Sequence, residues 1–169
     1  MSEQLHLAPP PIWQSLAEVE SAARACLQCG LCQTRKNVVF SSGNPQAKLM
    51  IIAEAPGRNE DELGVPFVGR SGKLFDKILE AGRIDREKEI YLCNVVKCRP
   101  PNNRLPLKEE IQACQKYLNA QLELVRPALI LLAGATAVEV VLHVKDPISR
   151  IRGTWFDWQF GAKVMPVFH

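Results

Sequence analysis

Three cysteines lie within seven residues in the stretch CLQCGLC, residues 26–32. Sulfur sites for zinc or for many iron–sulfur clusters take four thiolates, so Cys26, Cys29 and Cys32 alone leave one ligand missing. Two more cysteines, Cys98 and Cys114, are separated by fifteen residues and could complete the set. The pattern fits a zinc ion or an iron–sulfur cluster and does not distinguish the two. Disulfides and unconnected buried cysteines are the alternatives.

The composition indicates one globular α/β domain, with 169 residues, 47% hydrophobic and 23% charged. No run reaches the roughly eighteen apolar residues that a membrane span needs. The N-terminal stretch MSEQLHLAPPPIW lacks the basic start and apolar core of a signal peptide. We therefore expect a cytoplasmic protein with no membrane partner. Thiols stay reduced in that compartment, so six cysteines favour metal or cluster binding over disulfides.

Positive charge is concentrated in residues 93–108, CNVVKCRPPNNRLPLK, which include no acidic residue. The basic residues of this segment are Lys97, Arg99, Arg104 and Lys108. The net charge of +3 is weak evidence by itself. The segment is either a solvated loop or an edge that faces phosphates.

Predicted strands and helices alternate along the chain. Short apolar runs between turn residues predict strands over 48–55, 89–96, 128–134 and 162–168. Apolar residues at helical spacing predict helices over 13–26, 71–83, 107–125 and 135–143. Ser71 is the expected N-cap of the second helix. The alternation predicts a mostly parallel sheet covered by helices on both faces. The triple proline at 9–11 separates an expected tail, 1–11, from a single domain over 12–169.

Residues capable of chemistry follow the predicted strands. The first strand runs into Ala53–Gly57, AEAPG, and the second ends near Asn94. The third ends at Gly134 and the fourth at His169. In open parallel sheets, ligands bind outside the carboxyl ends of the strands. This order predicts a site at one edge of the sheet.

Several blocks resemble the family 4 uracil-DNA glycosylases, in order from Cys26 to His169: CLQC, GNP, AEAPGRNEDELGVPFVGRSG, NVVKCRPPNNRLP, LAG and VFH. The resemblance implies a three-layer α/β/α fold around a mostly parallel four-stranded sheet. It also implies a monomer that removes uracil from single- or double-stranded DNA by hydrolysing the N-glycosidic bond, which initiates base excision repair. A structural 4Fe–4S cluster is implied, with Cys32 as a spectator and with the ligands Cys26, Cys29, Cys98 and Cys114.

The resemblance assigns three residues to the uracil base. Phe67 matches the aromatic residue that stacks on the extruded base. Asn94 matches the amide that can accept from the ring N–H and donate to a carbonyl, which distinguishes uracil from cytosine. His169 matches the histidine of the second motif, whose N–H stabilises the negative charge that grows on the departing base.

The turn after the first strand matches the first motif of the family. Glu54 is the carboxylate expected to orient water or to stabilise a cationic sugar, and it ranks above Glu60 and Asp61. Gly57 shapes a tight turn that lets the backbone approach the base. Ala55 also belongs to the substrate-binding turn, at a position where other uracil glycosylase families have an aspartate.

The basic segment and the end of the chain complete the comparison. Lys97, Arg99 and Arg104 are candidates for contacts with DNA phosphates. The family continues past its second-motif histidine into a DNA-inserting loop and a final helix, whereas this sequence ends at His169. We therefore expect the C-terminal part of the domain to be missing.

Other functions share part of this pattern. One is a glycosylase for another deaminated base, such as hypoxanthine or xanthine. Another is a non-catalytic iron–sulfur protein that binds nucleic acid or carries electrons, and a zinc-stapled domain is the last. The combination of Phe67, Asn94 and His169 favours a glycosylase, because electron transfer needs no base pocket.

Overall fold

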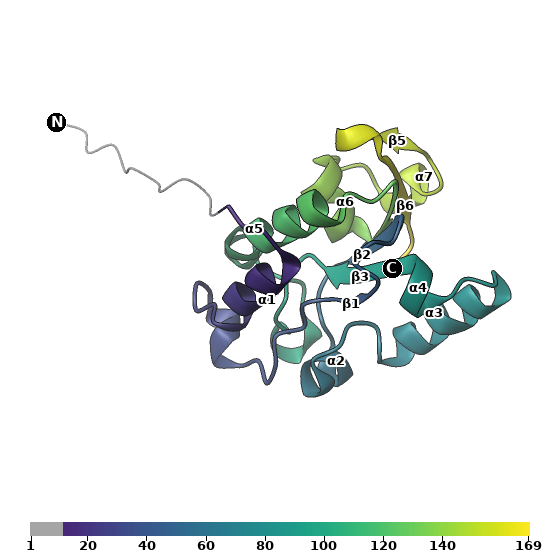
Figure 1. The fold of residues 1–169 in the computed structure, drawn as a ribbon. Helices are drawn as coiled ribbons and strands as arrows, with labels where there is room; N and C mark the ends of the chain where they lie inside the picture. The colour runs from purple at the N-terminus through teal and green to yellow at the C-terminus, as the bar shows by residue number, and fades with distance from the viewer. Residues whose placement is uncertain (1–11) are drawn as a thin grey trace.

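The computed structural model describes residues 12–169, so the expected tail over 1–11 lies outside the described residues. The chain forms a six-stranded sheet in the order β1-β3-β2-β4-β6-β5 (Figure 1). Its central strands are parallel and lie where the sequence predicts them, at β3 (Ile90–Asn94), β2 (Leu49–Ala53), β4 (Leu129–Ala133) and β6 (Lys163–Val167). The predicted four-stranded parallel core is confirmed.

Two further strands extend the sheet at its edges in the antiparallel direction. They are β1 (Ser42–Gly43), which pairs with β3, and β5 (Phe156–Asp157), which pairs with β6. The sequence does not predict them, because two residues are too few to show an alternation of apolar and polar side chains.

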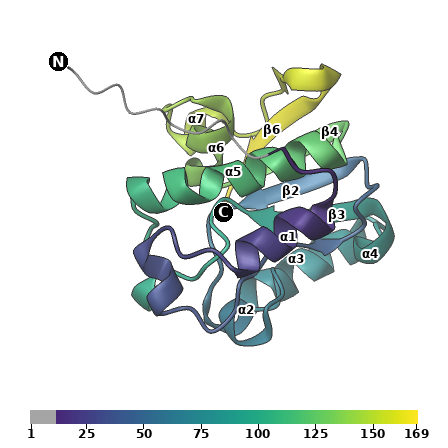
Figure 2. The same cartoon turned by 60° about the vertical axis from the view of Figure 1, so that its left-hand side comes forward.

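Successive residues of the central strands face two separate cores, as the pleat of a strand requires. Met50 and Ile52 of β2 belong to the larger core, and Ile51 between them belongs to the smaller one. The larger core includes residues of α1 (Leu16–Arg24), α5 (Lys108–Val125) and α6 (Ala135–Leu142). The smaller core includes residues of α3 (Arg70–Ala81) on the opposite face (Figure 2). The predicted three-layer α/β/α architecture is therefore confirmed.

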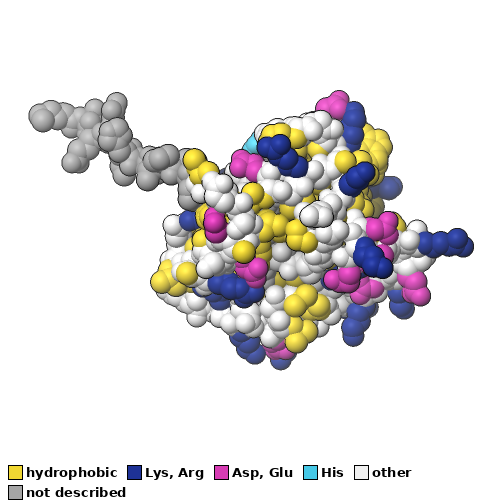
Figure 3. Space-filling view, viewed as in Figure 1, with side chains coloured by type: hydrophobic (Ala, Val, Ile, Leu, Met, Phe, Trp, Pro, Cys, Tyr) yellow, Lys and Arg dark blue, Asp and Glu magenta, His cyan; other side chains and the backbone are white. Residues whose placement is uncertain are grey.

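Short helical segments connect these layers. They are α2 (Arg58–Leu63), α4 (Arg86–Glu89), α7 (Ile148–Ile151) and the 3-10 turns η1 (Gly30–Gln33), η2 (Pro101–Asn103) and η3 (Gln159–Gly161). Across residues 12–169, no helix combines the length and apolar character needed to cross a membrane. On the face drawn in Figure 3, Lys and Arg side chains are interspersed with Asp and Glu.

The start of α3 is set by a contact with α2. The helix begins at Arg70 with Gly69 as its N-cap, so the expectation that Ser71 caps it is wrong. A carboxylate oxygen of Glu60 accepts hydrogen bonds from the backbone N–H groups of Val68, at 3.0 Å, and Gly69, at 2.7 Å. The Glu60 carboxylate therefore accepts N–H groups at the start of α3 in place of a local capping side chain. The sequence around Ser71 does not predict this contact.

The loop that carries Phe67 packs against α3 at a glycine. A Cβ atom at Gly72 would lie 2.0 Å from the carbonyl oxygen of Phe67 and 2.2 Å from its carbonyl carbon. The same oxygen accepts a hydrogen bond of 3.1 Å from Arg86 Nη1. Phe67 itself has a φ of 59°, a left-handed conformation that costs energy for a bulky residue. Packing of this loop therefore holds Phe67 in a position that local preference disfavours.

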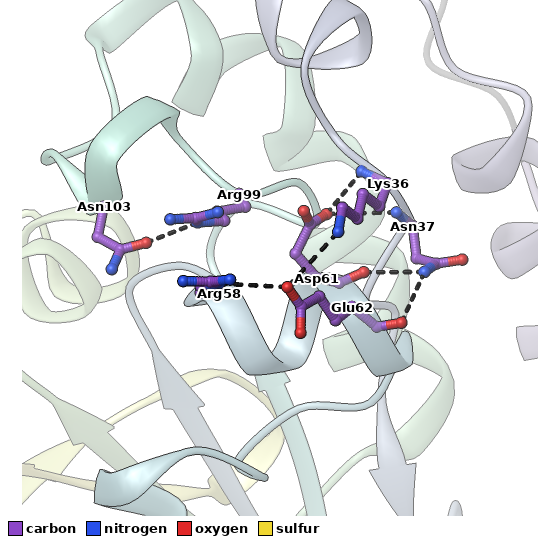
Figure 4. Close-up of polar contacts among 7 residues, drawn as sticks. All are labelled: Lys36, Asn37, Arg58, Asp61, Glu62, Arg99 and Asn103. Atoms are coloured by element: carbon purple, nitrogen blue, oxygen red, sulfur yellow. Dashed lines mark hydrogen bonds and ion pairs between the residues drawn. The ribbon is translucent and has the colours of Figure 1, made fainter.

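Helix α2 is also joined to the segment that follows the clustered cysteines. Asp61 is 2% exposed, and its Oδ1 accepts from the backbone N–H groups of Lys36, at 2.9 Å, and Asn37, at 3.2 Å. The Asn37 side chain donates in return to the backbone oxygens of Asp61 and Glu62 (Figure 4). Asp61 thus connects two segments of the chain, and its carboxylate serves as a structural hydrogen-bond acceptor.

Replacing Gly72 should destabilise the fold. In Gly72→Ala the added methyl group overlaps backbone atoms of Phe67, which we expect to cost about 3 kcal/mol or more of unfolding free energy. The gain of about 1 kcal/mol from alanine in a helix offsets only part of that. Urea denaturation followed by circular dichroism measures the difference. As a control, Gly82→Ala at the other end of α3 has no neighbour closer than 3.4 Å and should change stability by less than about 0.5 kcal/mol. Equal stability of the two variants would contradict the close approach.

Adjacent acidic residues of α2 should differ in their effects. Asp61→Ala removes a buried acceptor from two backbone N–H groups, and we expect a loss of about 1–3 kcal/mol in unfolding free energy. Glu62→Ala removes only surface ion pairs with Lys36 and Arg58, so its denaturation midpoint should stay close to that of the wild type. Chemical denaturation of both variants compares them, and a larger loss for Glu62→Ala would refute the structural role of Asp61.

Candidate functional site

A cavity of about 400 Å³ opens at the carboxyl ends of β2 and β3, where strand order predicts a site. Its walls come from the turn after β2, the first turns of α2 and α3, the loop before α3, the end of β3, the basic loop at 100–104 and the last residue of the chain. Seven of the site residues predicted from the sequence line this single cavity: Glu54, Ala55, Gly57, Phe67, Asn94, Arg104 and His169. The cavity thus combines an aromatic ring, an amide, a carboxylate and an imidazole.

Glu54 is held by contacts from two sides. Its Oε2 accepts a hydrogen bond of 2.5 Å from the hydroxyl of Thr136, in the first turn of α6. Its backbone oxygen accepts from Val96 at 3.2 Å, which extends the pairing of β2 with β3 beyond the last strand residues. Thr136 is absent from the sequence-based site. Its position just after the third predicted strand, at the same sheet edge, is the signal that could have identified it.

Phe67 is placed between the cavity and the smaller core. Its ring packs against Phe75 of α3, with the ring centroids 5.4 Å apart and the planes tilted by 54°. Arg86 holds the loop by donating to the backbone oxygens of Pro66, at 2.9 Å, and Phe67, at 3.1 Å. A flat base entering the cavity would meet an aromatic side chain supported from behind.

Asn94 and His169 line the cavity from the ends of β3 and β6, which are separated in the sheet by β2 and β4. Asn94 is the last residue of β3 and is only 3% exposed, so its amide lies deep in the cavity. His169 follows β6 and is exposed at the mouth. Gly134 makes room for it, because a Cβ atom there would lie 3.1 Å from the Cβ of His169. The deep amide suits recognition of a base edge, and the imidazole can approach from outside.

Glu60 lines the cavity but its carboxylate is engaged. Its Oε1 accepts two backbone hydrogen bonds from the start of α3, and a Cβ atom at Gly57 would lie 2.8 Å from its Oε2. Ala55 and Gly57 line the turn with little side-chain bulk. The Glu60 carboxylate thus serves as a backbone acceptor, and the ranking of Glu54 above Glu60 stays a prediction.

The basic segment differs from expectation at Lys97. This residue is 1% exposed, and its ammonium donates to the backbone oxygen of Asn94. The expectation that Lys97 contacts DNA phosphates is therefore wrong, because its charge is turned into the protein. The cluster of basic residues in the sequence predicted that Lys97 lies on the surface. The path of the chain after β3 instead directs its side chain into the protein.

The two arginines of the segment are engaged to different degrees. Arg104 forms a bidentate ion pair with Glu110, with N–O distances of 2.8 Å and 2.6 Å. This pair lowers the pKa of the Glu110 carboxyl and raises the pKa of the Arg104 guanidinium. Arg99 donates from Nε to the Asn103 side chain at 2.6 Å (Figure 4). Glu110 therefore compensates most of the charge of Arg104. Arg99 uses only its Nε in the hydrogen bond to Asn103, and its two Nη atoms take no part in that bond.

Two arginines that the sequence reasoning missed also line the cavity. Arg58 begins α2 and Arg70 begins α3, and both are exposed. They follow the two turns that build the cavity, so their proximity depends on how those turns pack. Nothing in the spacing of the sequence sets them apart from other surface arginines.

Four cysteines surround a second, small cavity: Cys26, Cys29, Cys98 and Cys114. Cys32 does not line it, and Cys93 is fully buried within β3. Burial raises the pKa of the Cys98 thiol and raises that of Cys114 to about 11. Across residues 12–169, no three or more His, Cys, Asp or Glu side chains are arranged to hold a metal ion.

Two of these sulfur atoms accept hydrogen bonds from outside the cysteine set. Arg35 Nη1 lies 3.2 Å from Cys98 Sγ, and the backbone N–H of Lys97 donates to Cys114 Sγ at 3.2 Å. Donors of this kind stabilise thiolate ligands and tune metal–sulfur sites. The four thiols have the donor chemistry of an iron–sulfur site.

Comparisons with a family model and with individual proteins both identify the same protein family. The model of the uracil DNA glycosylase superfamily matches residues 40–169. A type-4 uracil-DNA glycosylase of Thermotoga maritima is 44% identical over 152 residues, which cover 89% of this chain and 79% of the relative. Type-4 enzymes of Archaeoglobus fulgidus and Sulfurisphaera tokodaii are 39% and 37% identical, cover 92% of this chain, and are themselves covered to 81% and 74%. The chain therefore belongs to the uracil-DNA glycosylase superfamily and, within it, to the type-4 uracil-DNA glycosylases.

Proposed function

We propose that this chain hydrolyses the N-glycosidic bond between uracil and deoxyribose in DNA and so initiates base excision repair. The observation that carries the proposal is the single cavity lined by Phe67, Asn94, Glu54 and His169. Relatives named as type-4 uracil-DNA glycosylases match most of the chain, which supports the same reaction here.

The base must leave the stack before it can enter this cavity. Extruding a nucleotide from a duplex costs a few kcal/mol, and stacking on an aromatic ring returns roughly 1–3 kcal/mol per base. Phe67, supported by Phe75, provides that ring. Because these energies nearly cancel, unpaired and mismatched uracil should be better substrates than paired uracil.

Asn94 and His169 act on the base itself. The Asn94 amide accepts from the ring N–H of uracil and donates to a carbonyl oxygen, whereas cytosine presents the opposite pattern. An N–H of His169 donates to a uracil carbonyl and stabilises the negative charge of the departing base. The low exposure of Asn94, 3%, strengthens this discrimination, because an unmatched partner would leave buried polar groups unpaired.

Glu54 acts on the sugar side of the bond. Its carboxylate orients the attacking water or stabilises positive charge on the sugar, and the hydrogen bond from Thr136 fixes one of its oxygens. Arg58, Arg70 and Arg99 are the proposed phosphate contacts. Arg58 and Arg70 are exposed beside the cavity, and Arg99 uses only its Nε in the hydrogen bond to Asn103. Phosphate contacts position the DNA and carry no base preference.

The cysteine-lined cavity is proposed to hold a 4Fe–4S cluster with Cys26, Cys29, Cys98 and Cys114 as ligands. The donor chemistry fits, since all four cysteines line one cavity and two of their sulfur atoms accept hydrogen bonds from N–H groups. When bound, such a cluster crosslinks the segment after α1, the loop after β3 and α5. The enzyme acts as a monomer in the cytoplasm, where reducing conditions keep these thiols available.

A uracil-dependent cleavage assay tests the proposed reaction. The chain is incubated with a labelled single-stranded oligonucleotide containing one uracil, and abasic sites are cleaved with alkali. We expect cleavage with uracil and none with thymine. Asn94→Asp keeps the size of the side chain but removes its donor, so kcat/KM should fall by about 10²–10³-fold.

Asn119→Asp, on the exposed face of α5 outside the cavity, is the matched control and should cleave at the wild-type rate. Oligonucleotides with hypoxanthine or xanthine form further arms of the assay. Release of one of these bases, with uracil left intact, would replace the uracil assignment. A folded protein that binds the oligonucleotide and releases no base would show a non-catalytic binding role instead.

Cysteine variants test the proposed cluster. Cys26→Ser should abolish the broad visible absorbance of the purified protein and lower its thermal midpoint, because a ligand of the crosslink is lost. Cys32→Ser should retain both properties, since Cys32 lies outside the cavity. Iron and acid-labile sulfide analysis accompanies the spectra. Colourless wild-type protein that contains zinc would overturn the cluster assignment, and equal losses in both variants would overturn the ligand set.

A further inference from the structure

Lys97 is a buried cation between the two cavities. Its side chain is among the largest that are fully buried, and its Nζ donates to the backbone oxygen of Asn94. Within residues 12–169, no carboxylate forms an ion pair with Lys97. Burying an ammonium costs free energy unless an opposite charge or hydrogen bonds compensate it. One hydrogen bond to Asn94 leaves the charge of Lys97 without a counter-charge from these residues.

Three hydrogen bonds tie Lys97 to different parts of the chain. Its ammonium bonds Asn94, its backbone N–H donates to Cys114 Sγ at 3.2 Å, and its backbone oxygen accepts from Val39 at 2.8 Å. Lys97 also lines the cysteine cavity, directly before Cys98. The residue therefore touches the strand end that carries the uracil-reading amide and the sulfur set at the same time.

The sulfur set offers the missing counter-charge. An iron–sulfur core held by four thiolates is anionic, and a cation inside the protein beside it is stabilised by that charge. Arg35, the other cation at this cavity, already donates to Cys98 and is partly exposed. Lys97 differs because it is enclosed and because its Nζ reaches the backbone of Asn94.

We propose that Lys97 is a positioning residue: its ammonium balances the charge of the cysteine-held cluster and fixes the main chain at Asn94, so that uracil recognition depends on the cluster. The inference rests on the proposed function and cofactor. Lys97 contacts neither base nor phosphate. It acts through Asn94, and loss of its charge disturbs both cavities.

Lys97→Met, with similar length and no charge, tests this in the iron-containing protein. Loss of such an outer-shell partner should speed iron release to a chelator and lower kcat, each by about 10–100-fold. KM for the uracil oligonucleotide should change less than about twofold, because no phosphate contact is lost. Lys97→Arg keeps the charge with a broader head group, so it should release iron near the wild-type rate while kcat stays reduced. Lys48→Met, an exposed lysine before β2, should change none of these values.

Each contrary result identifies a different error. Wild-type iron release and kcat in Lys97→Met would overturn the proposal, and so would a raised KM with unchanged kcat, the signature of a phosphate contact. A lower kcat with unchanged iron release would overturn the dependence on the cluster. If Lys97→Met does not fold, Lys97→Arg decides, and full kcat in that variant would overturn the positioning role. A wild-type chain that releases no base would refute the proposed function, while iron release would still report on Lys97.

Discussion

The path of residues 94–98 is the constraint on which both cavities depend. Val95 and Val96 donate to the backbone oxygens of Ala53 and Glu54, so the chain stays paired with β2 beyond the end of β3. Asn94, at the start of this segment, lines the cavity at the sheet edge, and Cys98, at its end, lines the cysteine cavity. This pairing fixes the main chain that connects the two cavities.

Helix α2 supports the site through acceptors rather than through reactive groups. Glu60 and Asp61 are neighbours, yet each carboxylate accepts two backbone N–H groups from a different loop. Charged acceptors form stronger hydrogen bonds than neutral ones, so two residues can order both loops. Glu54 is the acidic residue of the cavity that remains suited to chemistry, with a hydroxyl rather than a backbone group on its oxygen.

Local patterns predicted the fold closely and the surface charges poorly. The central strands lie within the predicted ranges because buried apolar runs between turn residues admit few alternatives. The two-residue edge strands were too short for such a signal. Lys97 was expected at the surface and is 1% exposed, since spacing records that a charge is present but not which way it points. Arg104 was likewise expected to contact phosphates, and it forms an ion pair with Glu110 in the first turn of α5.

The sequence by itself determined the alternating strands and helices and the convergence of Glu54, Asn94 and His169 at one sheet edge, because parallel strands bring their carboxyl ends together. Only the tertiary structure decided which groups are free to act. The Thr136 hydrogen bond to Glu54 and the hydrogen bond from the backbone N–H of Lys97 to Cys114 Sγ join segments far apart in the chain. Such contacts arise from packing in three dimensions, and no periodicity or local spacing encodes them.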